Sequence, residues 1–256
     1  MSNNDRPLYG LIDLGGTKLL SLIVNAPGDI IGEDLRPSNT EEGLDSTVQR
    51  IGLSLDSALA GAGFGREQLR SVGVASPGAI NFEAGVVSEA PQLPGWQDVP
   101  LRDILRELLG LEVMLENDAN AAAVGEHVYG AGRGSRHMLY LTISTGIGGG
   151  IIIDGRLYRG KSGAAGELGH IVLDMNGPLC GCGARGCVES LASGTAIARE
   201  AQQLIAAGQA PVLSRLAQEE GEVTAETVYK AALEGEEISG RLLKQAGVYL
   251  GTALAS

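Results

Sequence analysis

The chain has 256 residues and a formal net charge of −12, enough length for one large or two modest domains with a real core. This acidic balance repels phosphodiester backbones and anionic lipid, so nucleic acids and membrane surfaces are excluded as expected partners. The first residues are polar, without the basic-then-apolar order of a signal peptide, and no apolar run is long enough to span a bilayer. The sequence therefore predicts a cytoplasmic protein.

The first half of the chain mixes strands and helices. Residues 8–13 and 18–25 are predicted strands, and the Gly15-Gly16 pair between them indicates a hairpin. Apolar residues recur three and four apart over residues 41–61, which predicts a helix. The other elements predicted here are strand 29–35, strand 70–75, a hairpin around 83–85, helix 99–109, strand 111–116 and helix 118–129. Trp96, the only tryptophan, is interpreted as a loop anchor.

The second half turns from strands to helices. Predicted strands cover residues 136–144, 150–154 and 156–159, and predicted helices cover 193–207, 224–233 and the chain from 236 onward. An opening meander followed by mixed elements favours an α/β fold of two lobes over a barrel or a bundle. We expect a smaller lobe over residues 1–118 and a larger lobe over residues 119–256.

One histidine and all three cysteines lie within 18 residues, from His170 to Cys187. His170, Cys180, Cys182 and Cys187 form the ligand set of a closed structural zinc site, because three thiolates and a neutral imidazole satisfy tetrahedral Zn²⁺. The alternative is three unrelated thiols beside a core histidine, but the chain has no cysteine elsewhere. Glu167 and Glu189 flank the cluster, and such ordered acceptors suit a polyhydroxylated ligand.

Two glycine-rich segments are candidates for phosphate binding. In residues 13–18, backbone N–H groups of a tight turn can face anionic oxygens, Asp13 can hold Mg²⁺ or its waters, and Lys18 adds positive charge. Residues 144–150 form a second such turn. Neither is a Walker loop or a dinucleotide fingerprint, because both join strand to strand. Each alone fits a plain hairpin turn equally well, but together they suggest two lobes closing on one nucleotide.

Asp118 is the candidate reacting carboxylate, since it stands where a predicted strand meets an alanine-rich helix. The alternative role is an N-cap whose side chain accepts backbone N–H groups. The two roles are compatible, although we expect the helix dipole to lower the pKa of Asp118. Even a modest base suffices for phosphoryl transfer, because positioning and charge stabilisation supply most of that catalysis.

These residues resemble the ROK sugar kinases of the actin-like ATPase superfamily, and bacterial glucokinases in particular, from Asp13 to about Ala255. The resemblance rests on seven motifs in the family's order: the turn at 13–18, Ser76-Pro77-Gly78, Pro94-Gly95-Trp96, residues 116–120 (ENDAN), residues 145–150 (TGIGGG), residues 166–170 (GELGH) and residues 180–189 (CGCGARGCVE). It implies a two-lobed ribonuclease H-like fold. Members of this family continue beyond the last helix seen here, so we expect this chain to be short of the family's C-terminal segment.

The resemblance also implies roles for individual residues. Asp118 would take the proton from the sugar 6-hydroxyl. Sugar hydroxyls would be bound by Gly78, Asn117, Asp118, Glu167, His170 and Glu189. The phosphates of ATP, with Mg²⁺, would be held by Asp13, Gly15, Gly16, Thr17, Lys18, Thr145 and Gly146. The implied activity is phosphoryl transfer from ATP to glucose, by a homodimer or a dimer of dimers.

Three alternatives remain open. The same family motifs occur in kinases for other hexoses and for N-acetylhexosamines. A nonenzymatic sugar-binding sensor or regulator is the competing class, although the acidic charge and the 12 residues before Asp13 argue against DNA binding. A small structural protein held together by zinc is the third, and it leaves the glycine turns and Asp118 unexplained.

Overall fold

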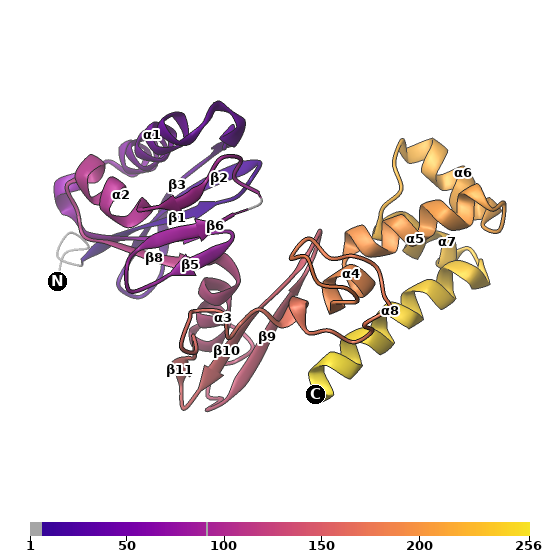
Figure 1. Cartoon of the computed structure of the whole chain (residues 1–256). Coiled ribbons are helices and arrows are strands. Elements are labelled where there is room, and N and C mark those ends of the chain that lie inside the picture. Colours follow the sequence, from indigo (N-terminus) through magenta and orange to yellow (C-terminus); the bar gives the residue numbers. More distant parts are fainter. Residues whose placement is uncertain (1–6, 91) are drawn as a thin grey trace. The chain divides into compact units, whose positions relative to one another are not determined.

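The computed structural model describes residues 7–90 and 92–256, which form two compact units (Figure 1). The first unit comprises the described residues up to Gly130 together with Arg159–Ala164, and the second comprises Ala131–Tyr158 and Ala165–Ser256. The sequence-based division between residues 118 and 119 differs from this one. Helix α3 (Asp118–Val128) packs on strands β4 and β8 of the first unit and therefore belongs to it.

The first unit is built on a five-stranded sheet in the order β3-β2-β1-β4-β8. Its strands are β1 (Leu8–Leu14), β2 (Lys18–Asn25), β3 (Ile30–Pro37), β4 (Leu69–Ser76) and β8 (Val113–Asn117). The first three strands form an antiparallel meander, which confirms the predicted glycine hairpin, whereas β4 and β8 run parallel to β1. This mixed order is the one expected for the predicted ribonuclease H-like fold.

Helices α1 (Leu44–Ala62) and α2 (Leu101–Leu109) pack against this sheet and against each other (Figure 1). Between them lies an apolar core whose fully buried members include Leu19, Ile51 and Leu105. Trp96 is only 3% exposed and belongs to the same core, which confirms its role as an anchor. The smaller elements are a second sheet of β5 (Ala79–Asn81), β6 (Val86–Glu89) and β7 (Gln97–Val99), and the 3-10 turns η2 (Thr40–Glu42) and η3 (Arg66–Gln68).

The second unit begins with an antiparallel sheet in the order β11-β10-β9 and continues mainly as helices. Its elements are β9 (Met138–Ile143), β10 (Ile147–Ile153), β11 (Arg156–Leu157), η4 (Leu168–His170), α4 (Val188–Ala192), α5 (Gly194–Ala206), α6 (Pro211–Glu220), α7 (Ala225–Leu233) and α8 (Glu237–Ala255). Val188, Leu213 and Val228 are fully buried in its core. Helices α4 and α6 were not predicted, whereas α5, α7 and α8 are confirmed.

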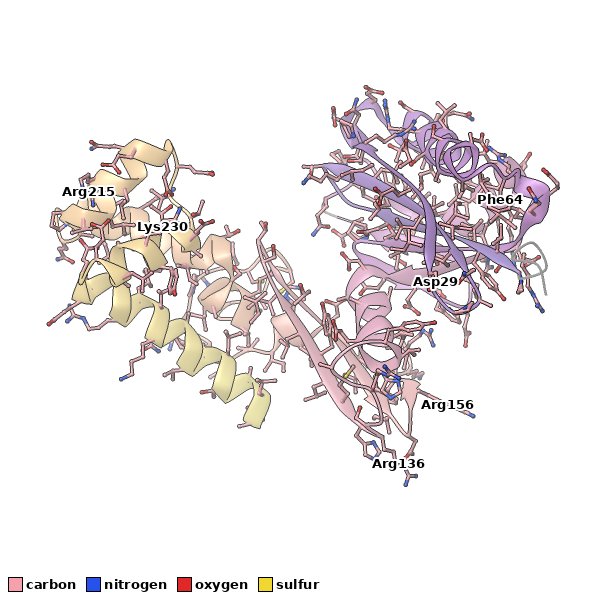
Figure 2. The ribbon with its side chains drawn as sticks, turned by 180° about the vertical axis from the view of Figure 1, so that it is seen from behind. Asp29, Phe64, Arg136, Arg156, Arg215 and Lys230 are labelled. Carbon is pink, nitrogen blue, oxygen red and sulfur yellow. The ribbon has the colours of Figure 1, made fainter. Side chains whose placement is uncertain are left out.

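The helical part of the second unit carries ion pairs on its surface. Arg215 of α6 pairs with Glu219 and Glu234, and Lys230 of α7 pairs with Glu220 and Glu226 (Figure 2). Exposed pairs of this kind contribute little stability each, so the apolar core provides most of what holds these helices together. Within the described residues, no helix combines the length and the apolar character that crossing a bilayer requires.

Candidate functional site

Asp118 is the first residue of α3, directly after β8, as the sequence predicts. The N-cap of α3 is Asn117, not Asp118: the Asn117 Oδ1 accepts the backbone N–H of Asn120 at 3.1 Å. The Asp118 carboxylate accepts the backbone N–H of Ala119 at 2.8 Å, and the residue remains exposed to solvent. A neutral amide thus satisfies the helix end and leaves the carboxylate accessible.

The pKa of Asp118 is raised above its ordinary value, so the predicted lowering by the helix dipole is wrong. Desolvation by the surrounding protein is the main cause, and the nearby charge of Asp13 adds to it, against the lowering effect of the Ala119 N–H. Desolvation also raises the pKa of Asp13. A carboxylate whose pKa is raised binds a proton more strongly, which makes Asp118 a better general base than the sequence suggested.

The first glycine turn joins β1 to β2 and is held tightly. The Gly15 N–H donates to the Lys18 carbonyl at 2.8 Å, and the Thr40 hydroxyl donates to the Gly16 carbonyl at 3.1 Å. A Cβ at Gly16 would lie 3.0 Å from the Gln92 carbonyl oxygen, so a side chain would fit there only if its surroundings shifted. Thr17 and Lys18 are exposed on this turn. Asp13 stands at its start, where a single carboxylate suits Mg²⁺, which takes one or two carboxylates plus phosphate oxygens.

Gly78 follows β4 and lies against Asn117. The Asn117 Nδ2 donates to the Gly78 carbonyl at 3.1 Å. Gly78 has φ of +91°, and a Cβ there would lie 2.2 Å from the Glu89 carbonyl oxygen, so only glycine fits without strain. A solvent-open pocket of about 380 Å³ lies next to this contact, lined by Glu89, Ala90 and residues 93–97. Gly78 and Asn117, both predicted to bind sugar, are therefore brought together in the first unit.

The second unit brings together all four predicted metal ligands. One ligand atom from each of His170, Cys180, Cys182 and Cys187 lies within 4.8 Å of the others. The Cys180 Sγ is 3.6 Å from the His170 Nδ1, and the Cys182 and Cys187 sulfurs are 3.7 Å apart. Tetrahedral zinc with Zn–S bonds of about 2.3 Å would separate two sulfurs by about 3.8 Å, so this cluster fits a zinc ion.

The electrostatics of the cluster also favour a cation. Burial raises the pKa of Cys187 to about 12, and the neighbouring thiols contribute to the same shift. Burial likewise raises the pKa of Cys180, whereas the Ala184 backbone N–H lowers the pKa of Cys182. Thiolates so close together repel one another unless a cation lies between them, and a Zn²⁺ ion would supply that charge.

His170 presents its second nitrogen away from the sulfurs. Its Nδ1 faces Cys180, and its Nε2 lies 3.8 Å from a carboxylate oxygen of Glu167. Both residues belong to the turn of η4, in which Glu167 is the N-cap position. A metal on Nδ1 would leave the proton on Nε2 and thereby fix the hydrogen-bonding character of the exposed edge of the ring.

Glu189 links the cluster of His170 and the three cysteines to the second glycine turn. One carboxylate oxygen of Glu189 accepts the Ile147 backbone N–H at 2.8 Å, and the other lies 3.8 Å from the Cys180 sulfur. Next to this contact, a Cβ at Gly146 would lie 2.5 Å from the Glu189 oxygen, so a side chain there would require the flexible end of Glu189 to move. In this conformation Glu189 binds the protein's own backbone, so its predicted role in binding sugar remains a prediction.

The second glycine turn is also held by α5. The Thr195 hydroxyl donates to the Thr145 carbonyl at 2.8 Å, and the Gly194 N–H donates to the Ser144 carbonyl at the same distance. The turn that contains Thr145 and Gly146 is therefore fixed from two sides. Sequence reasoning missed these connections because no local spacing relates residues 144–147 to residues 189–195.

Sequence reasoning also passed over Glu116 and Arg159. The Arg159 guanidinium donates to one carboxylate oxygen of Glu116, and the other oxygen of Glu116 accepts two donors from the start of α3. Glu116 was noted only as the end of a predicted strand and as part of a motif, and Arg159 only as the end of a predicted strand. The sequence offered one signal for this pair: Glu116 is a charged residue at the end of a predicted strand, two positions before the candidate base Asp118.

The ROK family model matches residues 9–256 of the chain. A glucokinase of Thermotoga maritima is 39% identical over 225 residues, which cover 88% of this chain and 69% of that protein. The solved ROK hexokinase of Thermus thermophilus has a TM-score of 0.81 and 37% identity, with 97% of this chain and 76% of that chain covered. A ROK family glucokinase of Streptomyces griseus, solved with glucose and AMPPNP, has a TM-score of 0.79 and 34% identity, covering 98% and 78%.

This chain belongs to the ROK family, and its fold is the actin-like ATPase fold of the ROK sugar kinases that it matches. Relatives with other names match as well. An N-acetylmannosamine kinase of Yersinia pseudotuberculosis is 34% identical over 95% of this chain and 76% of its own length, and a xylose repressor of Caldicellulosiruptor bescii is 31% identical over 96% and 61%.

Proposed function

We propose that this chain is an ATP-dependent hexokinase that transfers the γ-phosphoryl group of ATP to the 6-hydroxyl of glucose. The observation that carries the proposal is the state of Asp118. It is an accessible carboxylate with a raised pKa, freed from helix capping by Asn117, in a chain 39% identical to a glucokinase. Such a group is placed to accept the proton that a hydroxyl loses when it attacks phosphorus.

The chemical demand on Asp118 is modest. The transition state of phosphoryl transfer is loose, so the hydroxyl loses its proton late and most of the catalysis is positioning and charge stabilisation. Removing a positioned general base costs about 10² to 10⁴ in rate. Asp118 would therefore matter most through its place beside the sugar 6-hydroxyl, with its raised pKa strengthening the hydrogen bond it accepts from that group.

The two glycine turns would bind the phosphates of ATP. Gly16 and Thr17 would offer backbone N–H groups and a hydroxyl, while Gly15 keeps the turn tight through its own N–H, which donates to the Lys18 carbonyl. Lys18 would add charge, and Thr145 and Gly146 form the second turn. Asp13 would hold Mg²⁺, which neutralises developing charge on the phosphate oxygens. Both turns are anchored by hydrogen bonds to neighbouring segments of their own unit, so neither needs to be ordered when the nucleotide binds.

The sugar end would use acceptors and donors in fixed orientations. The Asn117 amide is held by Asn120 and Gly78, and the imidazole of His170 would be fixed by a structural Zn²⁺ on its Nδ1. Glu167 and, after release of Ile147, Glu189 would accept sugar hydroxyls. A site of this kind rejects analogues that lack a hydroxyl by up to about 10⁴ to 10⁵-fold, because its own polar groups are left unpaired.

A panel of hexoses and N-acetylhexosamines tested with ATP and Mg²⁺ in a coupled ADP-release assay tests the proposal. We expect glucose to give the highest kcat/KM. Asp118→Asn should lower kcat by about 10² to 10⁴ while glucose affinity by calorimetry stays within several-fold. Asp45→Asn is the matched control, because Asp45 is an exposed aspartate in the first turn of another helix, α1. ADP release in Asp118→Asn at the rate of the unmodified chain would refute the assignment.

The second candidate is a nonenzymatic sugar-binding regulator, favoured by the match to a xylose repressor. Such a protein would bind glucose in the calorimeter without releasing ADP. The net charge of −12 argues against a DNA-binding form of this candidate. A preference for N-acetylmannosamine in the same panel would instead point to the sugar specificity named for another relative.

Three further features belong to the proposal. Structural Zn²⁺ is supported by the sulfur spacing of the His170 and cysteine cluster. A cytoplasmic location is supported by three free cysteines gathered in one cluster, which suits a reducing compartment. A glycolytic role follows from the proposed phosphorylation of glucose. Assembly as a homodimer or a dimer of dimers follows from the family resemblance and is testable by light scattering.

A further inference from the structure

Both carboxylate oxygens of Glu116 accept hydrogen bonds, from three residues of the first unit. Its Oε1 accepts the Asn117 backbone N–H at 3.1 Å and the Asn120 Nδ2 at 3.2 Å. Its Oε2 accepts the Arg159 Nε at 2.8 Å and the Arg159 Nη2 at 2.5 Å. One oxygen thus holds the residues on either side of Asp118, and the other holds an arginine from a distant part of the chain.

Contacts with two residues hold the guanidinium group of Arg159 in position. Its guanidinium lies 3.9 Å from the centroid of the Phe82 ring, in a cation–π contact, while its donors engage Glu116. Arg159 also opens the segment Arg159–Ala164, which belongs to the first unit although the chain on both sides of it belongs to the second. The ion pair therefore fixes the point at which the chain re-enters the first unit.

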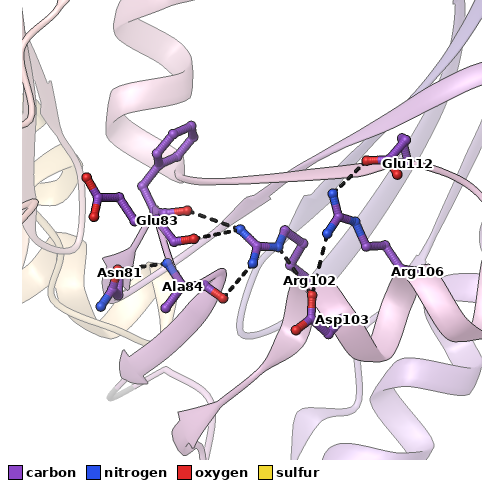
Figure 3. A network of polar contacts seen from close by, with 8 residues as sticks. Asn81, Glu83, Ala84, Arg102, Asp103, Arg106 and Glu112 are labelled. Carbon is purple, nitrogen blue, oxygen red and sulfur yellow. Dashed lines mark hydrogen bonds and ion pairs between the residues drawn. The ribbon is translucent and has the colours of Figure 1, made fainter.

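Arg102 of α2 holds the turn at residues 81–84, which carries Phe82. Figure 3 shows the Arg102 guanidinium donating to backbone carbonyls of this turn, at 3.0 Å for Glu83 and 2.8 Å for Ala84. The Asn81 side chain accepts the Ala84 N–H at 3.0 Å and closes the same turn. A row of contacts thus runs from α2 through the turn and Arg159 to Glu116 and the start of α3.

This arrangement is more than a surface ion pair. The side chains of Glu116 and Arg159 are 17% and 32% exposed, and partly exposed pairs alone contribute little to stability. The other carboxylate oxygen nevertheless accepts bonds from Asn117, the N-cap of α3, and from Asn120, the residue whose N–H that cap accepts, and these two residues flank the candidate base. These bonds from Glu116 hold the first turn of α3 in one orientation.

We propose that Glu116 and Arg159 are positioning residues for Asp118. Together they hold the first turn of α3 so that the Asp118 carboxylate has one orientation toward the substrate hydroxyl. The assignment of a reaction to Asp118 rests on the proposed function, whereas the clamp itself is a statement about the order of this turn. Catalysis is sensitive to such placement, since a shift of about 1 Å can cost about 100-fold in rate.

Arg159→Met is the primary test, because methionine keeps an apolar contact with Phe82 and removes every donor to Glu116. We expect kcat to fall about 10- to 100-fold while KM for glucose and for ATP changes less than about fivefold. Arg66→Met is the matched control: Arg66 makes a two-point ion pair with Asp56 in the same unit, at 30% side-chain exposure, remote in sequence from α3. Its kcat should stay within twofold of the unmodified chain.

Two further variants separate positioning from simple stability. Arg159→Lys keeps the charge but loses the planar, two-donor fork, so it should give a kcat between those of Arg159→Met and the unmodified chain. Glu116→Gln added to Arg159→Met removes the unpaired charge and keeps an oxygen for Asn117 and Asn120, so it should recover part of kcat. A merely structural pair would show neither the graded kcat nor the partial recovery.

Hydrogen exchange of the peptide covering residues 117–122 gives a readout that does not depend on activity. We expect faster exchange in Arg159→Met and no change in Arg66→Met. Unchanged exchange in Arg159→Met, or a kcat equal to that of the control variant, would overturn the clamp. Absence of ADP release by the unmodified chain would instead overturn the proposed function, and the exchange experiment would still decide on the clamp.

Discussion

Gly146→Ala tests whether Glu189 connects the cluster of His170 and the three cysteines to the second glycine turn. An alanine Cβ at this position would lie 2.5 Å from the Glu189 Oε2, the same atom that accepts the Ile147 N–H at 2.8 Å. Gly146 does not have a positive φ, so alanine brings no backbone strain of its own. The flexible end of the glutamate must therefore move away, and the hydrogen bond to Ile147 is lost with it.

The size of the effect follows from that bond. A hydrogen bond to a charged group contributes about 1.5 to 3 kcal/mol, and Ile147 is only 4% exposed, so water replaces the lost acceptor poorly. Replacing glycine also restricts the unfolded chain, which stabilises by about 0.4 to 1 kcal/mol. The expected net loss is about 1 to 2 kcal/mol, or about 2 to 8 °C in Tm for a chain of this size.

Gly247→Ala is the matched control in the same unit. Gly247 is exposed in α8, and nothing lies within 4 Å of a Cβ built there, so this substitution should stabilise by up to about 1 kcal/mol. Gly146→Ala made in a Glu189→Ala background should also cease to destabilise, because the obstructing oxygen is gone. Thermal unfolding of the four variants measures both effects. Equal costs of Gly146→Ala with and without Glu189 would refute the contact.

The other predictions concern Asp118, the metal cluster and Gly78. The pKa of Asp118 is higher in the folded state than its ordinary value of 3.8, so the ionised carboxylate destabilises the fold. Asp118→Asn should therefore raise Tm at neutral pH. This gain in Tm should shrink as the pH falls through the raised pKa toward 3.8 and below, because the carboxyl group is then protonated in both states. The same shift places the acidic limb of the kcat/KM–pH profile, which reports the free enzyme, above 3.8, and a limb at or below 3.8 would contradict it. Cys182→Ser should lower the zinc content by elemental analysis and weaken glucose binding through His170, whereas full zinc retention would exclude Cys182 as a ligand. Gly78→Ala should lower the free energy of unfolding by more than about 1 kcal/mol and weaken glucose binding, because the φ of +91° and the Glu89 carbonyl both oppose a side chain. A Tm equal to that of the unmodified chain would count against this prediction.

Local sequence signals were sufficient for several parts of the site. A glycine pair between two alternating runs predicted the β1–β2 hairpin because few other residues make so tight a turn. Cysteine and histidine spacing predicted the metal cluster because its ligands lie within one short loop. The position of Asp118 followed from a strand ending where an alanine-rich pattern begins. Each of these features depends on residues close together in the chain.

Features that depend on distant residues were not predictable in this way. The unit to which α3 belongs is decided by its packing on β4 and β8, and no composition change marks that choice. The contacts between Glu189 and Ile147 and between Arg159 and Glu116 join residues about forty positions apart. Helix α6 is different: Pro211 at its start and the buried Leu213 and Leu216 gave a usable local signal that was passed over.

At the start of α3, one residue caps the helix and its neighbour carries the candidate reactive carboxylate. Had Asp118 been the N-cap, its charge would have been stabilised by backbone N–H groups, and its pKa would have been lowered. With Asn117 as the cap, a neutral side chain closes the helix and holds Gly78, and Asp118 keeps a charge that desolvation and Asp13 disfavour. The residue that stabilises the turn and the residue that would react are therefore adjacent but separate. A swap of the two, Asn117→Asp with Asp118→Asn, should preserve the cap while moving the carboxylate into it, and the variant should fold normally yet fail to release ADP.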